Sequence, residues 1–300
     1  HETVTLDDYR RRYQQYRLDP DCRALHQQHP MICVWDDHES ADNSWRDGAE
    51  NHNEEEGLWA ARKNAAYQAY VEWLPIREQE AGKIWRAFQW GELLQLTMLD
   101  TRLWGRDEQS DVDGPARTLL GDDQEAWFQE RMESDATWQL IGQQVMLGHW
   151  DLATGSGFTS LNHDQWDGYG AARSRLFDSL ETATNPVVLT GDIHSHWAME
   201  LARDPHDPIA YNPETGEGSL GVEFVVSAVT SPGVSEPTST VLEMIALADN
   251  PHMRHVNFDF RGFILLDLVA DRVQADFYVI DGVRAEEGTV THERSFQVME

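Results

Sequence analysis

Two short polar segments carry the residue types of a hydrolytic metal site. The first is Trp35-Asp36-Asp37-His38-Glu39 and the second is Gly191-Asp192-Ile193-His194. Each follows an apolar run that predicts a strand, Met31–Val34 in the first case and Val187–Thr190 in the second. In an α/β protein, catalytic groups gather in the loops that leave the carboxyl ends of strands. Carboxylates bind hard cations and imidazoles bind transition metals, so the two loops are interpreted as halves of one polynuclear metal centre.

The residue types also indicate roles within that centre. Asp36 and Asp192 are the leading ligand candidates, because a carboxylate can bridge or anchor cations. His194 is expected to bind a metal through its neutral imidazole. The simpler alternative, in which these side chains only cap or solvate turns, stays open for each of them.

Periodicity and turn residues predict the elements that position these loops. Helices are expected over 6–17 (with Thr5 as N-cap), 21–28, 58–73, 122–132 and 167–182, and strands over 31–35, 93–99, 139–147, 187–190, 222–229, 263–269 and 273–280. The polar stretches 47–57, 105–121, 152–165 and 204–218 are expected to be loops. Strands that alternate with helices and end in an antiparallel hairpin predict one α/β domain with sheets flanked by helices.

The charge balance restricts the partners. The 300 residues include 53 Asp plus Glu against 23 Lys plus Arg, for a net charge of -30, and only Lys63 and Lys83 are lysines. Such a surface repels nucleic acid and anionic membranes, so neither is expected as a main partner. The same composition favours a halophilic or marine origin, with ordinary acidic bias as the alternative. Bound metal ions would reverse the sign locally and still admit a phosphate.

The cysteines and the hydropathy restrict the class of protein only slightly. Two cysteines, Cys22 and Cys33, exclude a disulfide scaffold, and whether the two are bonded stays open. No stretch approaches the roughly 20 apolar residues that a membrane-spanning helix needs. The chain begins with His1 rather than Met, so a missing signal peptide says nothing about export.

Several motifs in collinear order resemble the PhoD-like alkaline phosphatases, a branch of the metallophosphoesterases. The family's "TLxDYRxRY", "WDDHExxNN" and "RRxxAxQAYxE" patterns correspond to residues 5–13, 35–43 and 62–70. The further matching segments are Leu99-Asp100-Thr101-Arg102, Asp167-Gly168-Tyr169, Gly191-Asp192-Ile193-His194-Ser195, Glu223-Phe224 and Thr230-Ser231-Pro232-Gly233. The resemblance covers nearly the whole chain.

The resemblance implies a fold, metals and residue roles. The fold would be a four-layer αββα sandwich, two mixed sheets flanked by helices, with Fe³⁺ and Ca²⁺ as metals and Zn²⁺ or Mn²⁺ as alternatives. Asp37 would contact a metal, and His38 would donate a proton to the leaving group, with a merely supporting hydrogen-bonding role as the alternative. Asn43 would lie near metal and phosphate, and Arg62 would bind phosphate oxygens with its forked guanidinium. The family is commonly secreted by the twin-arginine route, which implies a periplasmic or secreted location.

Two departures from the family pattern bear on the site. Position 42 is Asp where the family usually has Asn, and the family's Gly-Asp-x-Ile-Tyr-Glu motif with its preceding ligand cysteine occurs nowhere in the chain. We therefore expect residues 1–300 to be the C-terminal major part of the catalytic domain, with an N-terminal segment needed to complete the metal site.

The expected activity is metal-dependent hydrolysis of small phosphomonoesters, with phosphodiesters as further substrates. The alternatives are a phosphodiesterase or phospholipase D-like enzyme of similar machinery, and a non-catalytic binding protein that keeps the fold. Arg102 is expected to form a buried pair with Asp100 that holds two loops together, and His149 is a weaker site candidate outside every family motif.

Overall fold

The computed structural model describes residues 2–77, 80, 82–110, 112–153, 159–160, 162–285 and 287–300. Its main element is a seven-stranded mixed sheet with the order β1-β2-β3-β6-β8-β7-β9. These strands span Arg86–Trp90 (β1), Leu94–Met98 (β2), Trp138–Gly142 (β3), Pro186–Thr190 (β6), His196–Ala202 (β7), Ser219–Val225 (β8) and Met253–Asn257 (β9). The four central strands β2, β3, β6 and β8 run parallel, so their carboxyl ends share one edge.

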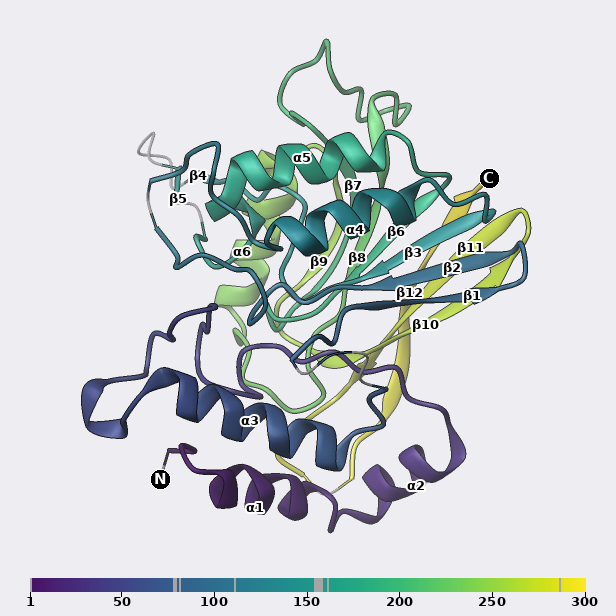
Figure 1. Ribbon diagram of the computed structural model, residues 1–300. Helices are drawn as coiled ribbons and strands as arrows, with labels where there is room; N and C mark the ends of the chain where they lie inside the picture. The colour runs from purple at the N-terminus through teal and green to yellow at the C-terminus, as the bar shows by residue number, and fades with distance from the viewer. Residues whose placement is uncertain are drawn as a thin grey trace.

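One face of this sheet is covered by two helices, α4 (Asp122–Met132) and α5 (Gly170–Leu180), as Figure 1 shows. Phe128 from α4 and Leu176 from α5 pack against Ile141 of β3 and Val188 of β6 in one buried cluster. The remaining helices are α1 (Leu6–Tyr16), α2 (Pro20–Gln28), α3 (Trp59–Trp73) and α6 (Thr238–Asp249), with single-turn 3₁₀ helices over Glu54–Glu56 and Trp166–Tyr169.

The other face of the large sheet packs on a three-stranded antiparallel sheet, β10 (Arg261–Val269), β11 (Arg272–Ile280) and β12 (Val290–Met299). Leu140 and Val187 point to this side because successive strand residues face opposite ways, and they pack with Val273 and Phe277 of β11. A short ribbon pairs β4 (Leu152–Ala153) with β5 (Thr159–Ser160). The expected mixed α/β fold with sheets and flanking helices is confirmed.

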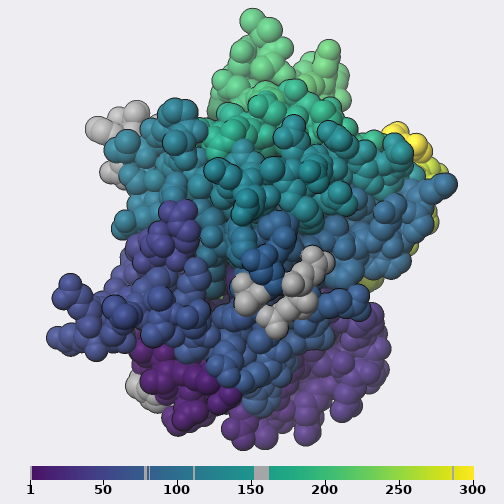
Figure 2. Space-filling model, in the orientation of Figure 1, coloured from purple at the N-terminus to yellow at the C-terminus, as the bar shows by residue number. Residues whose placement is uncertain are grey.

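The N-terminal part forms a separate layer beneath the sheets, which Figures 1 and 2 show in purple and blue. Thr5 caps α1 in a capping box with Asp8, as its position predicts. Helix α3 buries Arg62, Ala66 and Ala69, one face at helical spacing, and α1 packs against it.

The expected strand over 31–35 is wrong. This segment has no sheet pairing among the described residues, although it leads into the first acidic loop as expected. A buried Arg86 side chain donates a hydrogen bond to the Cys33 carbonyl oxygen at 2.7 Å, which supplies one of the contacts that a ladder would. Trp35 is buried edge-on against Tyr67 and Tyr70 of α3, so side-chain packing rather than a sheet fixes the segment.

Two further strands differ from the prediction in where they begin or end. The expected strand over 139–147 ends at Gly142. The strand expected over 222–229 begins and ends earlier, as β8 (Ser219–Val225). Part of the loop expected over 152–165 lies outside the described residues. The hairpin of β10 and β11 is confirmed, and both cysteines are free. Within the described ranges, no helix is long and apolar enough to cross a bilayer.

Candidate metal centre

The two acidic loops meet in space. Asp36, Asp37 and Asp192 each place one carboxylate oxygen within 4.8 Å of the others. Asp192 stands two residues after β6, at the edge that collects the carboxyl ends of the parallel strands. The loop after the 31–35 segment brings Asp36 and Asp37 to the same place. Carboxylates at this spacing are suited to hold a hard cation between them.

Arg102 lies at the centre of this cluster and is completely buried. Its Nε donates to Asp36 Oδ1 at 2.7 Å, its Nη1 to Asp164 Oδ1 at 2.8 Å and its Nη2 to Asp192 Oδ1 at 2.5 Å. The expected pairing with Asp100 is wrong for the side chain, because Asp100 Oδ1 accepts the backbone N–H of Arg102 instead. The guanidinium therefore holds three loops together rather than two.

Two residues of the centre, Asp164 and Gln165, were not predicted from the sequence, which indicated only a loop over 152–165. Asp164 accepts from Arg102 and, at 2.7 Å, from Nη2 of the buried Arg106. Gln165 donates to the second oxygen of Asp192 at 2.5 Å. Both precede the Asp167-Gly168-Tyr169 motif, which was the only hint that this stretch approaches the site.

The charges of the cluster do not balance. Two guanidinium groups face four carboxylates, which leaves two negative charges uncompensated among the described residues; the groups are Arg102, Arg106, Asp36, Asp37, Asp164 and Asp192. Burial raises the pKa of Asp36 well above its usual range, against the attraction of Arg102, and it also raises the pKa of Asp192. A bound cation would supply the missing positive charge, so the donor set fits a metal.

The exposed imidazole of His38 lies beside the aspartate cluster. Its backbone N–H donates to Asp37 Oδ1 at 2.7 Å, while its imidazole is 69% exposed, with Nε2 3.9 Å from Asp37 Oδ2 and 3.7 Å from Asp42 Oδ1. The carboxylates of Asp37 and Asp42 together with His38 form a second group with ligand atoms within 4.8 Å of one another. An exposed imidazole beside the buried Asp37 carboxylate can exchange protons with a bound molecule.

Asn43 holds the loop through its backbone. It adopts a left-handed conformation with φ 48°, and its N–H donates to Asp37 Oδ2 at 2.9 Å. Its side-chain amide donates to Glu50 at 2.6 Å. Both oxygens of Asp37 are thereby oriented by backbone N–H groups of its own loop.

The Gly191–His194 turn is strained. Asp192 and His194 both have positive φ, 64° and 55°, a conformation that costs a non-glycine residue about 1 kcal/mol or more. Arg261 supports the turn by donating to the His194 carbonyl oxygen. Such strain is concentrated at functional sites, and here it occurs at the two candidate ligands that follow β6, Asp192 and His194.

A cavity of about 530 Å³ lies beside the two loops, although none of the three clustered aspartates lines it. His38 and His194 line it from the two loops, and three tyrosines of α1 line it from the other side; the residues are Tyr9, Tyr13, Tyr16, His38 and His194. Ser231 and Pro232, from the segment that follows β8, also line it. Both candidate histidines therefore face a space large enough for a small ester.

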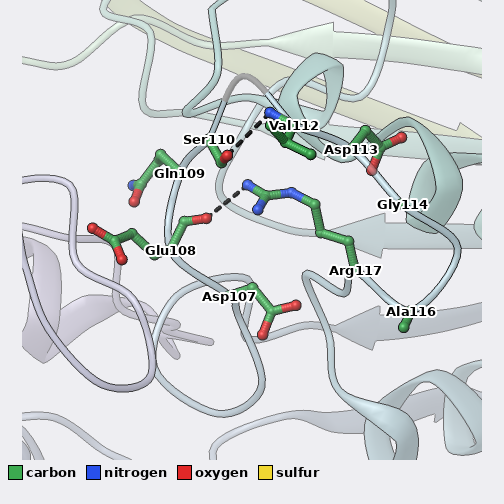
Figure 3. A pocket seen from close by; sticks show the side chains of 9 residues that line it. All are labelled: Asp107, Glu108, Gln109, Ser110, Val112, Asp113, Gly114, Ala116 and Arg117. Atoms are coloured by element: carbon green, nitrogen blue, oxygen red, sulfur yellow. Dashed lines mark hydrogen bonds between the residues drawn. The ribbon is translucent and has the colours of Figure 1, made fainter.

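A larger cavity of about 720 Å³ lies over the 107–117 loop (Figure 3). Arg117 spans it and donates to the Glu108 carbonyl oxygen at 2.7 Å. Gln109 connects this cavity to the metal centre, because its amide donates to Asp164 at 2.7 Å and to the Asn43 carbonyl oxygen at 2.9 Å. None of the three clustered aspartates lines it.

Arg62 lies among α1, α3 and the loop before α3. The buried guanidinium donates to Glu2 at 2.9 Å, to Glu56 at 3.2 Å and to the Tyr9 hydroxyl at 3.3 Å. Tyr9 in turn donates to the Ser40 carbonyl oxygen at 2.5 Å, which connects Arg62 to the first acidic loop. In the part of the chain that the structure describes, no hydrogen bond or ion pair joins Arg62 to the aspartates.

A mixed sheet with carboxylates gathered near the carboxyl ends of its strands defines an α/β protein with a candidate metal centre. A family model described as PhoD-like phosphatase matches residues 1–277. Alkaline phosphatase D of Bacillus subtilis (strain 168) is 33% identical over 313 residues, which cover 98% of this chain and 52% of that protein. A solved structure described as "Structure of PhoD" superposes with a TM-score of 0.87 at 32% identity, covering 99% of this chain and 58% of the other.

The chain belongs to the PhoD-like phosphatase family. The family expected from the sequence motifs is thereby confirmed. The chain spans about half the length of the curated relative that it matches.

Proposed function

We propose that this protein is a metal-dependent alkaline phosphatase that releases inorganic phosphate from small phosphomonoesters, with phosphodiesters as further substrates. The observation that carries the proposal is the convergence of Asp36, Asp37 and Asp192 from two loops whose histidines, His38 and His194, line a cavity. The relative named alkaline phosphatase D and the PhoD-like family support the same activity.

Asp36, Asp37 and Asp192 would hold metal together. Asn43 and His194 are proposed as further ligands from the sequence, although His194 is in no ligand group among the described residues. Metal ions at such a centre neutralise phosphoryl oxygens and lower the pKa of bound water, which makes a nucleophile near neutral pH. Fe³⁺ with Ca²⁺ is the proposed pair, with Zn²⁺ or Mn²⁺ as alternatives. Arg102 orients Asp36 and Asp192 through separate hydrogen bonds and keeps these carboxylates in place when no cation separates them.

Proton transfer is assigned to His38. Its exposed ring lines the cavity, so its proton can reach the oxygen of a departing alcohol. The carboxylates of Asp37 and Asp42 lie 3.9 Å and 3.7 Å from His38 Nε2, which keeps the ring beside the aspartate cluster. Arg62 is proposed to bind phosphate oxygens, because it donates to Tyr9, which lines the cavity. Its guanidinium would exchange its present bonds to Glu2 and Glu56 for the phosphate.

A periplasmic or secreted location is part of the proposal, in line with the family. The acidic surface and the metal centre suit small phosphoesters and disfavour a polyanionic nucleic acid as substrate.

Metal analysis combined with two substrates tests the proposal. Purified protein is expected to contain iron, calcium, zinc or manganese, and to hydrolyse p-nitrophenyl phosphate faster than bis-p-nitrophenyl phosphate. A faster diester reaction would instead establish the phosphodiesterase alternative. Active protein that holds none of these metals would refute the metal centre, and metal-loaded protein that is inactive on both esters would leave the binding-protein alternative.

A further inference from the structure

A second group of metal-ligating side chains lies outside the aspartate cluster. His149 and Asp151 come from the segment that follows β3, and His206 comes from the loop between β7 and β8. One ligand atom from each of the three residues lies within 4.8 Å of the other two. Two imidazoles and a carboxylate form a donor set that differs from the oxygen-rich set of the metal centre.

The imidazole of His149 is oriented by a carboxylate. Its Nδ1 lies 2.8 Å from Asp167 Oδ1, and Asp167 is also bonded by Arg173 and by the Trp150 N–H at 2.9 Å. When His149 donates its Nδ1–H to Asp167, the lone pair on Nε2 is free to bind a metal ion. This pairing is the one that supports metal-binding histidines in proteins.

Asp151 has an oxygen without a partner. Its Oδ1 is buried and has no hydrogen-bond partner among the described residues. Its backbone is fixed on both sides, because its N–H donates to Asn250 Oδ1 at 2.9 Å and its carbonyl oxygen accepts from Asn250 Nδ2 at 2.9 Å. A fixed carboxylate with an unsatisfied buried oxygen is unfavourable in water-excluded surroundings, and a bound cation would satisfy it.

His206 completes the group from the solvent side. Its residue is exposed, and its ring stands edge-on to the ring of His149, with 5.8 Å between centroids and 88° between planes. Its backbone N–H donates to Asp204 at 3.0 Å in a local turn. An exposed third ligand leaves room for a water molecule as the fourth.

We propose that His149, Asp151 and His206 bind one divalent transition-metal ion, with Zn²⁺ as the best match. Zinc accepts histidine nitrogen and carboxylate oxygen at about 2 Å in tetrahedral geometry, so its ligands lie about 3.3 Å apart. The three ligand atoms now lie within 4.8 Å of one another, so a bound ion would draw them together by up to about 1.5 Å. Calcium and magnesium are disfavoured because they prefer all-oxygen sites. The ion would connect the β7–β8 loop to the segment after β3.

A zinc competition titration on tag-free protein tests this site. The Asp192→Asn background is used throughout, so that zinc bound at the aspartate cluster contributes less. His206→Ala is compared with His29→Ala, because His29 is exposed on the C-terminal side of α2 and belongs to no ligand group among the described residues. A chromophoric zinc chelator reports the number and affinity of bound ions, and circular dichroism confirms that each variant is folded.

The His29→Ala protein is expected to bind one more zinc ion per chain than the His206→Ala protein, or to bind it at least tenfold more tightly. Asp151→Asn, which keeps the shape and removes the charge, is expected to lose at least tenfold in the same affinity. Equal zinc binding by all three variants would overturn the proposal, as would the absence of micromolar zinc binding in His29→Ala. Neither outcome bears on the phosphatase proposal, which rests on other residues.

Discussion

At the scale of single residues, the centre depends on buried charge that is held by many directed contacts. Asp192 shows this most clearly: Arg102 binds one of its oxygens at 2.5 Å and Gln165 binds the other at 2.5 Å. The carboxylate is therefore fixed before any cation arrives. Fixing a ligand in advance lowers the cost of binding and of reaching the reactive geometry.

Asp192→Asn is expected to remove a ligand charge while keeping the side-chain shape. Metal content should fall and turnover of p-nitrophenyl phosphate should drop by about a hundredfold or more, while the far-ultraviolet circular dichroism stays unchanged. Asp271→Asn, in the exposed turn between β10 and β11, is the matched control. Near-normal turnover with full metal content in Asp192→Asn would place the metal centre elsewhere.

Arg102→Lys is expected to destabilise the fold. A lysine ammonium cannot reproduce three hydrogen bonds in three directions, so at least one carboxylate loses its partner. Breaking a buried ion pair costs about 3 kcal/mol in the free energy of unfolding. Urea unfolding of the metal-free protein measures the loss.

The control for Arg102→Lys is Arg10→Lys, because Arg10 also bonds a carboxylate, Glu72, but on the surface. Exposed pairs contribute about 1 kcal/mol or less. Similar losses in both variants would show that Arg102 does not carry the buried charge of the cluster.

At the scale of elements, Glu223 ties three parts of the sheet together. It is fully buried in β8, and its carboxylate accepts from the Leu147 N–H at 2.9 Å, the Gly148 N–H at 2.7 Å and the Thr190 hydroxyl at 2.6 Å. These contacts join β8 to the end of β6 and to the segment that leads to His149. The residue belongs to the Glu223-Phe224 motif, and its place in the fold is structural.

Burial raises the pKa of Glu223 to about 6, against hydrogen bonds that favour its charged form. The native state therefore holds this proton more tightly than the unfolded chain does, and stability is lost as the pH rises from about 4.5 to about 6. Wild-type protein should lose on the order of 2 kcal/mol relative to Glu223→Gln between these pH values. Urea unfolding at pH 4.5 and pH 7 measures this difference.

Glu217→Gln, an exposed change in the loop before β8, controls for the general effect of pH on so acidic a protein. The wild type and Glu217→Gln should show the same pH dependence. If Glu223→Gln also follows it, then the Glu223 carboxyl titrates as it does in the unfolded chain.

The sequence predicted elements where pattern and local structure agree. Helix α1 begins after Thr5 because its cap and box are local, and the β10–β11 hairpin alternates cleanly along both strands. Strands β1, β7, β9 and β12 were missed because charged or polar side chains interrupt their apolar pattern, and the pairing with neighbours stabilises them. Helix α6 was missed as well. The segment over 31–35 has the apolar pattern of a strand but packs against α3 instead.

The candidate site was predictable where one short motif supplies the ligand. Asp36, Asp37 and Asp192 could be grouped because each follows an apolar run, although only the run before Asp192 is a strand. Arg102 was singled out, but its side-chain partners come from 66, 62 and 90 residues away in the chain, and no local pattern encodes such contacts. Asp164 and Gln165 join the centre through the same long-range packing.

At the scale of the whole molecule, the net charge of -30 acts on every state of the chain. Self-repulsion is stronger in the compact native state than in the expanded chain, so it destabilises the fold at low salt. Screening shortens the range of this repulsion from about 10 Å at 0.1 M salt to about 3 Å at 1 M. Because 53 Asp plus Glu face only 23 Lys plus Arg, the salt relieves more repulsion between like charges than attraction within ion pairs.

We therefore expect metal-free protein to gain roughly 2 kcal/mol in unfolding free energy between 0.05 M and 1 M NaCl, measured by urea unfolding at pH 8. Screening should act mostly below about 0.3 M, where the Debye length falls fastest. Sulfate stabilises proteins by exclusion from their surface, and that effect keeps rising with concentration. Equal ionic strengths of NaCl and Na₂SO₄ should therefore give the same gain at low salt and diverge only at high salt. A gain that appears only with sulfate would show that exclusion, and not the charge of the chain, governs its salt response.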